Sequence, residues 1–406
     1  MPPAQSPVPR PDEPAPFGAR GSNQSGMRAH NERLVLSLVR RHGALSKAEI
    51  ARSTGLSAQT VSVIMRELEA EGLLMKGEKV RGKVGQPSVP MRLVPGGAYF
   101  FGLKIGRRTV ELILLNFTGE VMGRRRAAHR YPTPDSTVSF VTEGVAALRD
   151  LLPDDAGDRI AGLGIAMPFL LWDWARSLGM DAEEMEGWRR RDIGAELGDH
   201  LDMPVFLQND ATSACGAELV FGGAPARDFL YFYIGTFIGG GVVLNGNVFA
   251  GATGNAGALG SMPVPTSRGV QQLIDVASLS GLEAEVIASG ANADRIWESA
   301  EGWSLPDDAV ARWIDGASEG IAYAATAAAS IVDFPIVMVD GWMPRSLRAR
   351  LVQATRDALE RIDLKGLEPP AIVEGTVGAD ARTLGAASLP LSERYLVDNS
   401  ALLRAG

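Results

Sequence analysis

The chain has 406 residues, a net charge of −8, 46% hydrophobic residues and one cysteine, Cys215. This length is enough for two or three domains with substantial cores. A single cysteine excludes an internal disulfide and a multi-cysteine metal site. No segment reaches the roughly 18 consecutive apolar residues of a membrane-spanning helix, and the N-terminus lacks the apolar run of a signal peptide. These features predict a cytoplasmic protein with no membrane partner.

Charge is distributed unevenly along the chain. Residues 27–93 contain 12 Lys and Arg against 6 Asp and Glu, a net charge of +6, whereas the charges of residues 1–26 balance. Residues 94–406 therefore carry the remaining −14. A basic segment joined to an acidic body indicates a polyanionic partner for the basic segment alone.

Residues 1–26 begin with a proline-rich stretch, in which seven of the first sixteen residues are Pro. Such a composition has little apolar surface to bury, so we expect a disordered tail. The first helical pattern covers Arg28–His42 and ends before Gly43. Its predicted apolar face consists of Leu34, Val35, Leu38 and Val39.

The next segment has the pattern of a helix–turn–helix. Ser46 and Glu49 have the spacing of a capping box, which predicts a short helix ending near Ser53, and Gly55 supplies the turn. Ser57 can cap a second helix that is apolar on one face and polar on the other, as a helix that reads a major groove requires. The predicted DNA contacts on this helix are Ser57, Gln59, Thr60, Ser62 and Arg66.

Two alternating segments, 73–79 and 88–93, flank a basic tip that contains two glycines. This pattern predicts the strands and tip of a wing. A charged hairpin tip often serves only solubility, but its position beside a recognition helix favours contact with phosphates or the minor groove. The predicted wing contacts are Arg81, Lys83 and Gln86. Residues 27–93 are therefore predicted to form a winged helix–turn–helix DNA-binding domain.

Residues 94–406 have an α/β pattern, in which apolar strand-like runs alternate with helical stretches. The predicted strands are Tyr99–Ile105, Val110–Asn116, Ile160–Met167, Val205–Leu207, Phe229–Ile234, Val242–Leu244 and Ile336–Asp340. The predicted helices are Thr137–Leu152, Ser213–Phe221, Gly320–Val332 and Arg345–Arg361. Asn245 and Gly246 indicate a type I′ hairpin. Hairpins near the start of two halves predict two similar lobes with a cleft between them.

Three segments of this body bear on chemistry: FGLKIGR at 101–107, the Asn209-Asp210 pair, and a glycine-rich stretch at 231–264. Glycine-rich strand–turn segments can hold phosphates through backbone N–H groups. Together with the winged helix–turn–helix, the GQPS sequence of the wing and the closing GADARTLGAASLPL, they resemble the ROK family of repressors and sugar kinases over about residues 20–395. The resemblance implies a multidomain fold, with the winged helix–turn–helix followed by a two-lobed α/β domain of the actin/hexokinase-like ATPase fold.

The chain departs from the ROK kinases at two loops. The kinases have a D-x-G-G-T-type loop whose Asp helps to hold metal and phosphate, and the matching positions here are Lys104, Gly106 and Arg107. A later G-G-G segment of the kinases reads Asp340-Gly341-Trp342-Met343 in this chain. Phosphoryl transfer requires Mg²⁺ beside the phosphates and close approach of the backbone. We therefore predict that ATP binding is lost and that the chain is not an enzyme.

The resemblance also implies a half-conserved sugar site. Asp210 matches the catalytic base of the kinases, and a carboxylate with a neighbouring amide suits vicinal hydroxyls. An Asn-Asp pair after a strand also caps the following helix, and both roles can coexist. The E-I-G-H motif of the family reads Ala258-Leu259-Gly260-Ser261, so two polar sugar contacts are replaced. The candidate effector-binding residues are Asn209, Asp210, Gly241, Asn255 and Ser261.

The family's zinc motif is absent, because residues 267–286 contain neither Cys nor His. We therefore expect no zinc and no other cofactor. Trp172, Trp174 and Trp188 follow the predicted strand that ends near Pro168. They could line a ligand site, although buried tryptophan is commoner.

These features favour a DNA-binding transcriptional regulator that binds a palindromic operator as a homodimer or higher homo-oligomer and senses a sugar-like effector. The resemblance implies control of carbohydrate metabolism, most often by repression, with activation left open. Two alternatives remain: an active ROK sugar kinase with a DNA-binding arm, and a DNA-binding protein whose body is only an oligomerisation scaffold.

Overall fold

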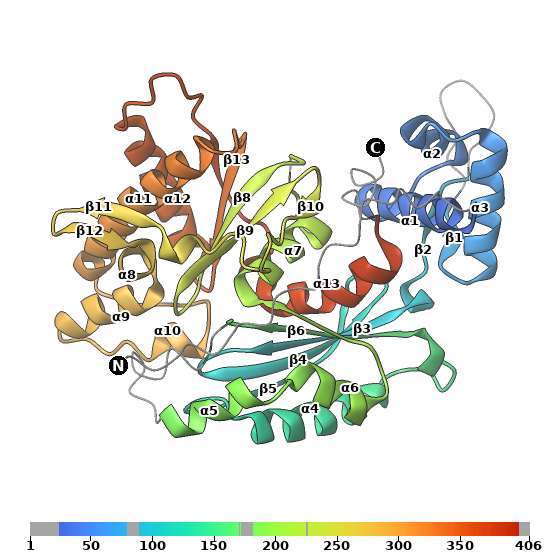
Figure 1. Ribbon diagram of the computed structural model, residues 1–406, viewed down its shortest axis with the longest axis horizontal. Helices are drawn as coiled ribbons and strands as arrows, with labels where there is room; N and C mark the ends of the chain where they lie inside the picture. Colours follow the sequence, from blue (N-terminus) through green and yellow to red (C-terminus); the bar gives the residue numbers. More distant parts are fainter. Residues whose placement is uncertain (1–23, 79–88, 170, 172–181, 225, 398–406) are drawn as a thin grey trace, which may run out of the picture.

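The computed structural model describes residues 24–78, 89–169, 171, 182–224 and 226–397. They form a small head at the N-terminal side and a larger two-lobed α/β body (Figure 1). The head is the predicted winged helix–turn–helix, and the body has the predicted two-lobed architecture.

The head contains three helices and a short antiparallel sheet. Its elements are α1 (Gln24–His42), α2 (Lys47–Thr54), α3 (Ala58–Ala70), β1 (Leu74–Lys76) and β2 (Met91–Leu93). The predicted capping box precedes α2: the Ser46 hydroxyl accepts from the Glu49 N–H, and the Glu49 carboxylate accepts from the Ser46 N–H. Gly55 ends α2 with a φ of 71°, a backbone conformation that favours glycine. The sequence therefore predicts the α2–turn–α3 unit correctly.

Two boundaries of the head differ from the prediction. The first helix begins at Gln24, inside the segment 1–26 predicted as a tail, and residues 1–23 lie outside the described part. Among the described residues, the wing strands pair only over 74–76 and 91–93. The fully buried apolar side chains of α1 are Val35, Leu36 and Val39, whereas Leu34 and Leu38 are half-buried.

Each lobe of the body contains a five-stranded sheet. The first-lobe strands are β3 (Tyr99–Ile105), β4 (Thr109–Asn116), β5 (Val121–Ala128), β6 (Ile160–Met167) and β7 (Val205–Asn209). The second-lobe strands are β8 (Phe229–Ile234), β9 (Ile238–Leu244), β10 (Asn247–Val248), β13 (Ile336–Gly341) and β14 (Ala371–Glu374). The sheet orders are β5-β4-β3-β6-β7 and β10-β9-β8-β13-β14. In both sheets an antiparallel meander is extended by two parallel strands, so the predicted repeat of two similar lobes is confirmed.

Helices cover both sheets. They are α4 (Pro134–Arg149), α5 (Ala182–Arg190), α6 (Ile193–Leu201), α7 (Asp210–Phe221), α8 (Leu273–Ala277), α9 (Leu279–Ala288), α10 (Arg295–Glu298), α11 (Asp307–Ala329), α12 (Arg345–Glu360) and α13 (Ala381–Tyr395). A hairpin, β11 (Pro263–Thr266) and β12 (Gly269–Gln272), precedes α8. Figure 1 shows α4, α5 and α6 on the outer face of the first sheet, and the apolar faces of α8, α9, α11 and α12 share one core with the second sheet.

The helices α7 and α13 pack against each other between the two sheets. α13 lies on β3 and β6 of the first sheet, and α7 lies on β9 of the second. Two glycines permit this close approach: a Cβ at Gly164 would lie 1.8 Å from the Ala386 carbonyl oxygen, and a Cβ at Gly385 would lie 1.8 Å from the Ser213 carbonyl oxygen. Side chains at these positions would push the layers apart, so the two lobes meet through one tightly packed helix pair.

The turn between β9 and β10 has the predicted form. Asn245 and Gly246 have φ values of 54° and 75°, and Leu244 pairs with Asn247, which defines a two-residue hairpin loop.

The predicted helix Gly320–Val332 is only the second half of α11, whose first half also faces the core with Trp313 and Ile314.

Candidate nucleic-acid interface and effector site

The polar residues predicted to contact DNA lie on α3. Ser57 is its N-cap, and the Ser57 hydroxyl accepts a hydrogen bond from the Thr60 N–H at 3.0 Å. Ser57, Gln59 and Arg66 are exposed, whereas Thr60 and Ser62 are half-buried. The opposite face of α3 is buried through Val61, Ile64, Met65 and Leu68. The helix is therefore fixed by its apolar face and presents a polar face to solvent, as a recognition helix must.

The head also carries exposed cations. Those without an ion-pair partner among the described residues are Arg41, Lys47, Arg52, Arg66 and Arg92. By contrast, Arg28 pairs with Glu32 and Glu67, and Lys76 pairs with Glu69. Cations that are not neutralised by protein carboxylates remain available to DNA phosphates. The predicted wing contacts Arg81, Lys83 and Gln86 lie outside the described residues, so their contact with DNA stays a prediction.

The head shares a hydrophobic core with the first lobe. Val39 of α1 belongs to the same buried cluster as Phe100, Phe117 and Tyr395. The Tyr395 ring lies 4.9 Å from the Phe117 ring and 5.9 Å from the Phe100 ring, measured between centroids. The Arg40 guanidinium donates to the Phe117 carbonyl oxygen, and burial lowers the pKa of Arg40 to about 10. Arg40 therefore belongs to the junction between head and body and is not one of the exposed cations.

Asn209 and Asp210 lie where β7 ends and α7 begins. The Asn209 side-chain oxygen accepts from the Ala211 and Thr212 N–H groups at 3.0 and 3.3 Å, so Asn209 caps α7. The Asp210 carboxylate forms an ion pair with the Arg382 guanidinium at 3.2 Å, and both side chains are less than a fifth exposed. Arg382, at the start of α13, was not predicted as a site residue. One carboxylate oxygen of Asp210 is therefore engaged by a cation of the protein itself.

The other candidate effector residues have different surroundings. Gly241 is buried in β9, and a Cβ there would lie 2.5 Å from Cβ of Cys215 on α7, so close packing alone accounts for glycine at this position. Asn255 and Ser261 are exposed, Ser261 at the end of the short 3₁₀ helix η4 (Leu259–Ser261). For all three residues, contact with an effector stays a prediction.

Lys104 lies near the end of β3, and Arg107 lies in the loop between β3 and β4. Lys104 is 6% exposed, its ammonium group donates to the Thr109 hydroxyl at 3.0 Å, and it lies 5.8 Å from the Trp342 ring, which follows β13 in the second lobe. Burial and, to a smaller degree, the charge of Arg382 lower the pKa of Lys104 to about 7. A buried cation thus stands where the resemblance places a metal-binding carboxylate, so these residues do not fit a metal–nucleotide complex.

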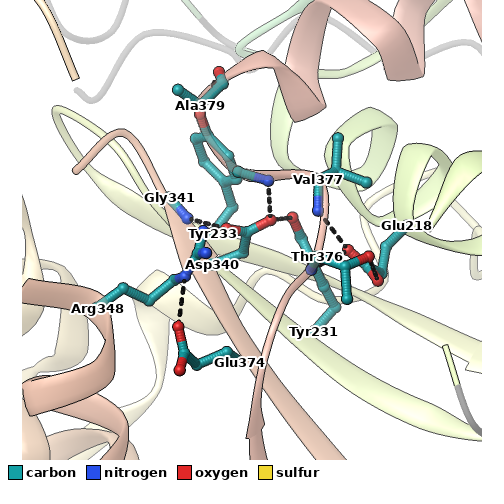
Figure 2. A network of polar contacts seen from close by, with 11 residues as sticks. Glu218, Tyr231, Tyr233, Asp340, Gly341, Arg348, Glu374, Thr376, Val377 and Ala379 are labelled. Carbon is teal, nitrogen blue, oxygen red and sulfur yellow. Dashed lines mark hydrogen bonds and ion pairs between the residues drawn. The ribbon is translucent and has the colours of Figure 1, made fainter. Parts of the chain in front are cut away.

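The end of β13 is held by a network of buried polar contacts (Figure 2). Asp340 is fully buried, and its carboxylate accepts hydrogen bonds from the Arg348 guanidinium (2.6 Å), the Tyr231 hydroxyl (3.0 Å) and the N–H groups of Gly341 (2.9 Å) and Gly378 (2.8 Å). Glu218 of α7, also fully buried, accepts from Thr376 and Val377. The resemblance places a nucleotide contact in segment 340–343. There the Asp340 carboxylate already accepts hydrogen bonds from donors of the protein itself.

The stretch that corresponds to the family's zinc motif forms β12, α8 and α9. Leu273, Leu279 and Leu282 bury it against the second-lobe core, and residues 267–286 offer no thiolate or imidazole ligand. These residues do not fit a zinc ion. Among the described residues, no group of three His, Cys, Asp or Glu side chains is placed to hold a metal.

Trp188 is buried, and its indole N–H donates to the Pro132 carbonyl oxygen at 2.8 Å, so it is a core residue. Trp172 and Trp174 lie outside the described residues.

In the described part of the chain, no helix has both the length and the hydrophobicity needed to cross a bilayer.

Comparison with known proteins identifies both parts of the chain. The family model "ROK family" matches residues 100–393, and the model "Winged helix-turn-helix DNA-binding" matches residues 28–75. The xylose repressor of Bacillus subtilis is 24% identical over 244 residues, which cover 60% of this chain and 62% of that protein. The chain thus matches somewhat less than two thirds of that relative.

Two solved structures have the same fold. A ROK family transcriptional regulator, described as a homologue of the Escherichia coli Mlc protein, has a TM-score of 0.64 at 19% identity and covers 93% of this chain and 99% of its own. A ROK family glucokinase from Streptomyces griseus has a TM-score of 0.54 at 20% identity and covers 72% of this chain and 99% of its own. With the family model matching well over half of its length, the chain belongs to the ROK family and carries a winged helix–turn–helix module ahead of its ROK domain.

Proposed function

We propose that this chain is a DNA-binding transcriptional repressor whose ROK domain senses a sugar-like molecule and does not transfer phosphate. The observation that carries the proposal is the exposed polar face of α3, on a head whose unpaired cations suit duplex DNA. The similarity to a xylose repressor supports the sugar-related role. A homodimer would place two copies of α3 in successive major grooves of a palindromic operator.

The helix α13 offers a physical route from the lobes to the head. It begins next to Arg382, which is paired with Asp210, and it ends at Tyr395, which packs on Phe100 and Phe117 beside the head. Its 15 residues, with Pro390 in the interior, correspond to about 22 Å of helix. A ligand that favours one arrangement of the lobes would therefore also favour one position of the head.

Replacing Arg66 by Ala should weaken operator binding roughly tenfold, because it removes an exposed cation from the recognition helix. Fluorescence anisotropy on a duplex selected from a random-sequence pool with the full chain would measure the change. The matched control is Arg268→Ala, an exposed arginine on the turn between β11 and β12, which should bind like the unmodified chain. Equal affinity of the Arg66 and Arg268 variants would remove Arg66 from the predicted DNA contacts.

Replacing Tyr395 by Ala should loosen the head from the body, because its ring packs on Phe100 and Phe117 inside the buried cluster that also contains Val39 of α1. We expect faster amide hydrogen exchange in α1 and a loss of stability of about 3 kcal/mol. A sugar response of operator binding, where one exists, should weaken in this variant. Tyr323→Ala, at an exposed tyrosine of α11, is the control. Unchanged exchange in α1 of the Tyr395 variant would show that this aromatic contact does not hold the head.

A further inference from the structure

A cleft between the two lobes is lined mainly by cations. Its outer part has a volume of about 820 Å³, and its narrow inner end has a volume of about 30 Å³. The two parts share Arg107, Arg108, Thr109, Arg126 and Trp297, so we treat them as one depression and call it the basic cleft. The cations of the inner end are Lys104, Arg107, Arg108, Arg126 and Arg382, and none of the described residues that line it is Asp or Glu.

Carboxylates of the described residues do not balance these charges. Arg108 pairs with Glu283 at 3.1 Å, and Arg382 pairs with Asp210 at 3.2 Å. Lys104, Arg107 and Arg126 have no ion-pair partner in the described part of the chain. Two guanidinium groups and the Lys104 amine therefore converge on the inner end without an ion-pair partner among the described residues.

Hydrogen-bond donors are also left over at the inner end. The ammonium group of Lys104 has three N–H donors, and among the described residues it uses one, on the Thr109 hydroxyl. The Nε atom of Arg382 is buried and has no hydrogen-bond partner among the described residues. Buried cations with spare donors are unfavourable in a protein by itself, and they are characteristic of sites where a ligand supplies the missing charge. The lowered pKa of Lys104 agrees with this lack of negative charge, because burial and neighbouring cations disfavour its protonated form.

We propose that the basic cleft binds a small phosphorylated polyol, such as a sugar phosphate, with its phosphate group at the inner end. A phosphate group supplies both the charge and the acceptor oxygens that Lys104 and the arginines lack. The inner end is too narrow for a nucleobase or a DNA duplex, whereas the outer part has the size of a small-molecule site.

The outer part of the cleft suits the polyol. Its lining includes the exposed carboxylates of Asp294 and Glu298, which can accept hydrogen bonds from hydroxyl groups, and the indole ring of Trp297. The site itself is independent of the proposed function, but its use as a sensor rests on that function. Arg382 connects the two, because it lines the inner end and lies at the start of α13, the helix that reaches the head.

The test compares glucose 6-phosphate, glucose and inorganic phosphate as ligands of the full chain by isothermal titration calorimetry, in a buffer without phosphate or sulfate. Glucose 6-phosphate should bind at least tenfold more tightly than either fragment. Equal affinity for glucose and glucose 6-phosphate would overturn the phosphate site. Equal affinity for inorganic phosphate and glucose 6-phosphate would overturn the role of the outer part.

Variants locate the site. Arg107→Gln and Lys104→Met should each weaken glucose 6-phosphate binding about tenfold or more, because each removes a charged contact with the phosphate. Arg107 has no described carboxylate partner, so its replacement leaves no buried acid unpaired and keeps the test valid if the Lys104 variant fails to fold. Arg268→Gln, remote and exposed, should bind normally. Full affinity in the Arg107 variant would overturn the assignment.

Operator binding is measured separately, with and without glucose 6-phosphate. Binding of the sugar phosphate with the expected variant pattern but no effect on DNA affinity would support the cleft and contradict its use as a sensor. Absence of any specific DNA binding would contradict the proposed function and leave the calorimetric result for the cleft unaffected.

Discussion

A Lys104→Met variant should be more stable than the unmodified chain at pH 7. The Lys104 side chain is 6% exposed, and burial lowers its pKa from 10.5 to about 7. Methionine has a similar length and no charge, so it can fill the same space without the desolvation penalty. The lowering of the pKa corresponds to a penalty on the order of 4–5 kcal/mol.

The expected dependence on pH follows from proton linkage. Between pH 7 and 10.5 the unfolded chain holds the Lys104 proton and the folded chain does not, so the stability of the unmodified chain rises with pH through this window. Below pH 7 both states hold the proton and the penalty is constant. The advantage of the Met variant should therefore be largest at and below pH 7 and shrink toward pH 10.

Other groups around Lys104 do not produce this difference. Its charged neighbours Arg382, Glu111, Arg126 and Asp210 are the same in both proteins, so they do not distinguish the variant from the unmodified chain. Burial lowers the pKa of His129, whose ring contacts the Gly106 carbonyl oxygen, and so moves its titration further below the window. Urea unfolding of both proteins at pH 6, 7, 8 and 9 would measure the effect. A Met variant that is less stable at every pH would show that Lys104 is already compensated in the folded chain.

The gain in stability should accompany a loss of function. The same substitution is expected to weaken binding of a phosphorylated ligand, because the uncompensated ammonium group is the feature that attracts it. Residues that destabilise the unliganded fold and serve a ligand are common at functional sites. A variant that becomes more stable and also keeps full affinity would separate these two properties and place the phosphate elsewhere.

The sequence predicts the buried strands of the body better than its exposed edges. The bounds of β3, β6 and β8 agree with the prediction because each is a largely apolar run that is buried on both faces, with Lys104 of β3 as the charged exception. β5 has the sequence VMGRRRAA and is largely exposed, so no alternation of apolar residues marks it as a strand. It exists because its backbone pairs with the edge of β4, a long-range contact that local pattern does not contain.

The candidate sites show the same limit. Ser57 and the polar face of α3 could be predicted, because a cap and a helical face are local features of the sequence. The basic cleft could not, since Lys104, Arg126, Trp342 and Arg382 are separated by long stretches of chain and meet only when the lobes close on each other. The signal available in the sequence was the replacement of an acidic loop residue by Lys104. No comparable departure from the family pattern indicated Arg382, which lines the inner end of the cleft together with Lys104.

Replacing Asp340 by Ala should destabilise the second lobe by about 3–5 kcal/mol, because it leaves a buried cation without its partner. The Arg348 side chain is 9% exposed, and it would keep only Glu374, at 3.2 Å, as an ion-pair partner among the described residues. The Tyr231 hydroxyl and the N–H groups of Gly341 and Gly378 would also lose their acceptor (Figure 2). Urea unfolding, monitored by circular dichroism, would measure the loss of stability.

A second variant separates two effects of the Asp340 substitution: the unpaired charge of Arg348 and the loss of an acceptor for the neutral donors. In the double variant Asp340→Ala/Arg348→Met no unpaired guanidinium remains, so a large part of the lost stability should return. The return should be incomplete, because the Tyr231 hydroxyl and two backbone N–H groups still lack an acceptor. If the double variant were no more stable than the single one, the carboxylate would act mainly through these neutral donors. One of these donors, the Gly378 N–H, lies in the loop between β14 and α13 that precedes Arg382, so in that case ligand binding in the basic cleft should fall in both variants alike.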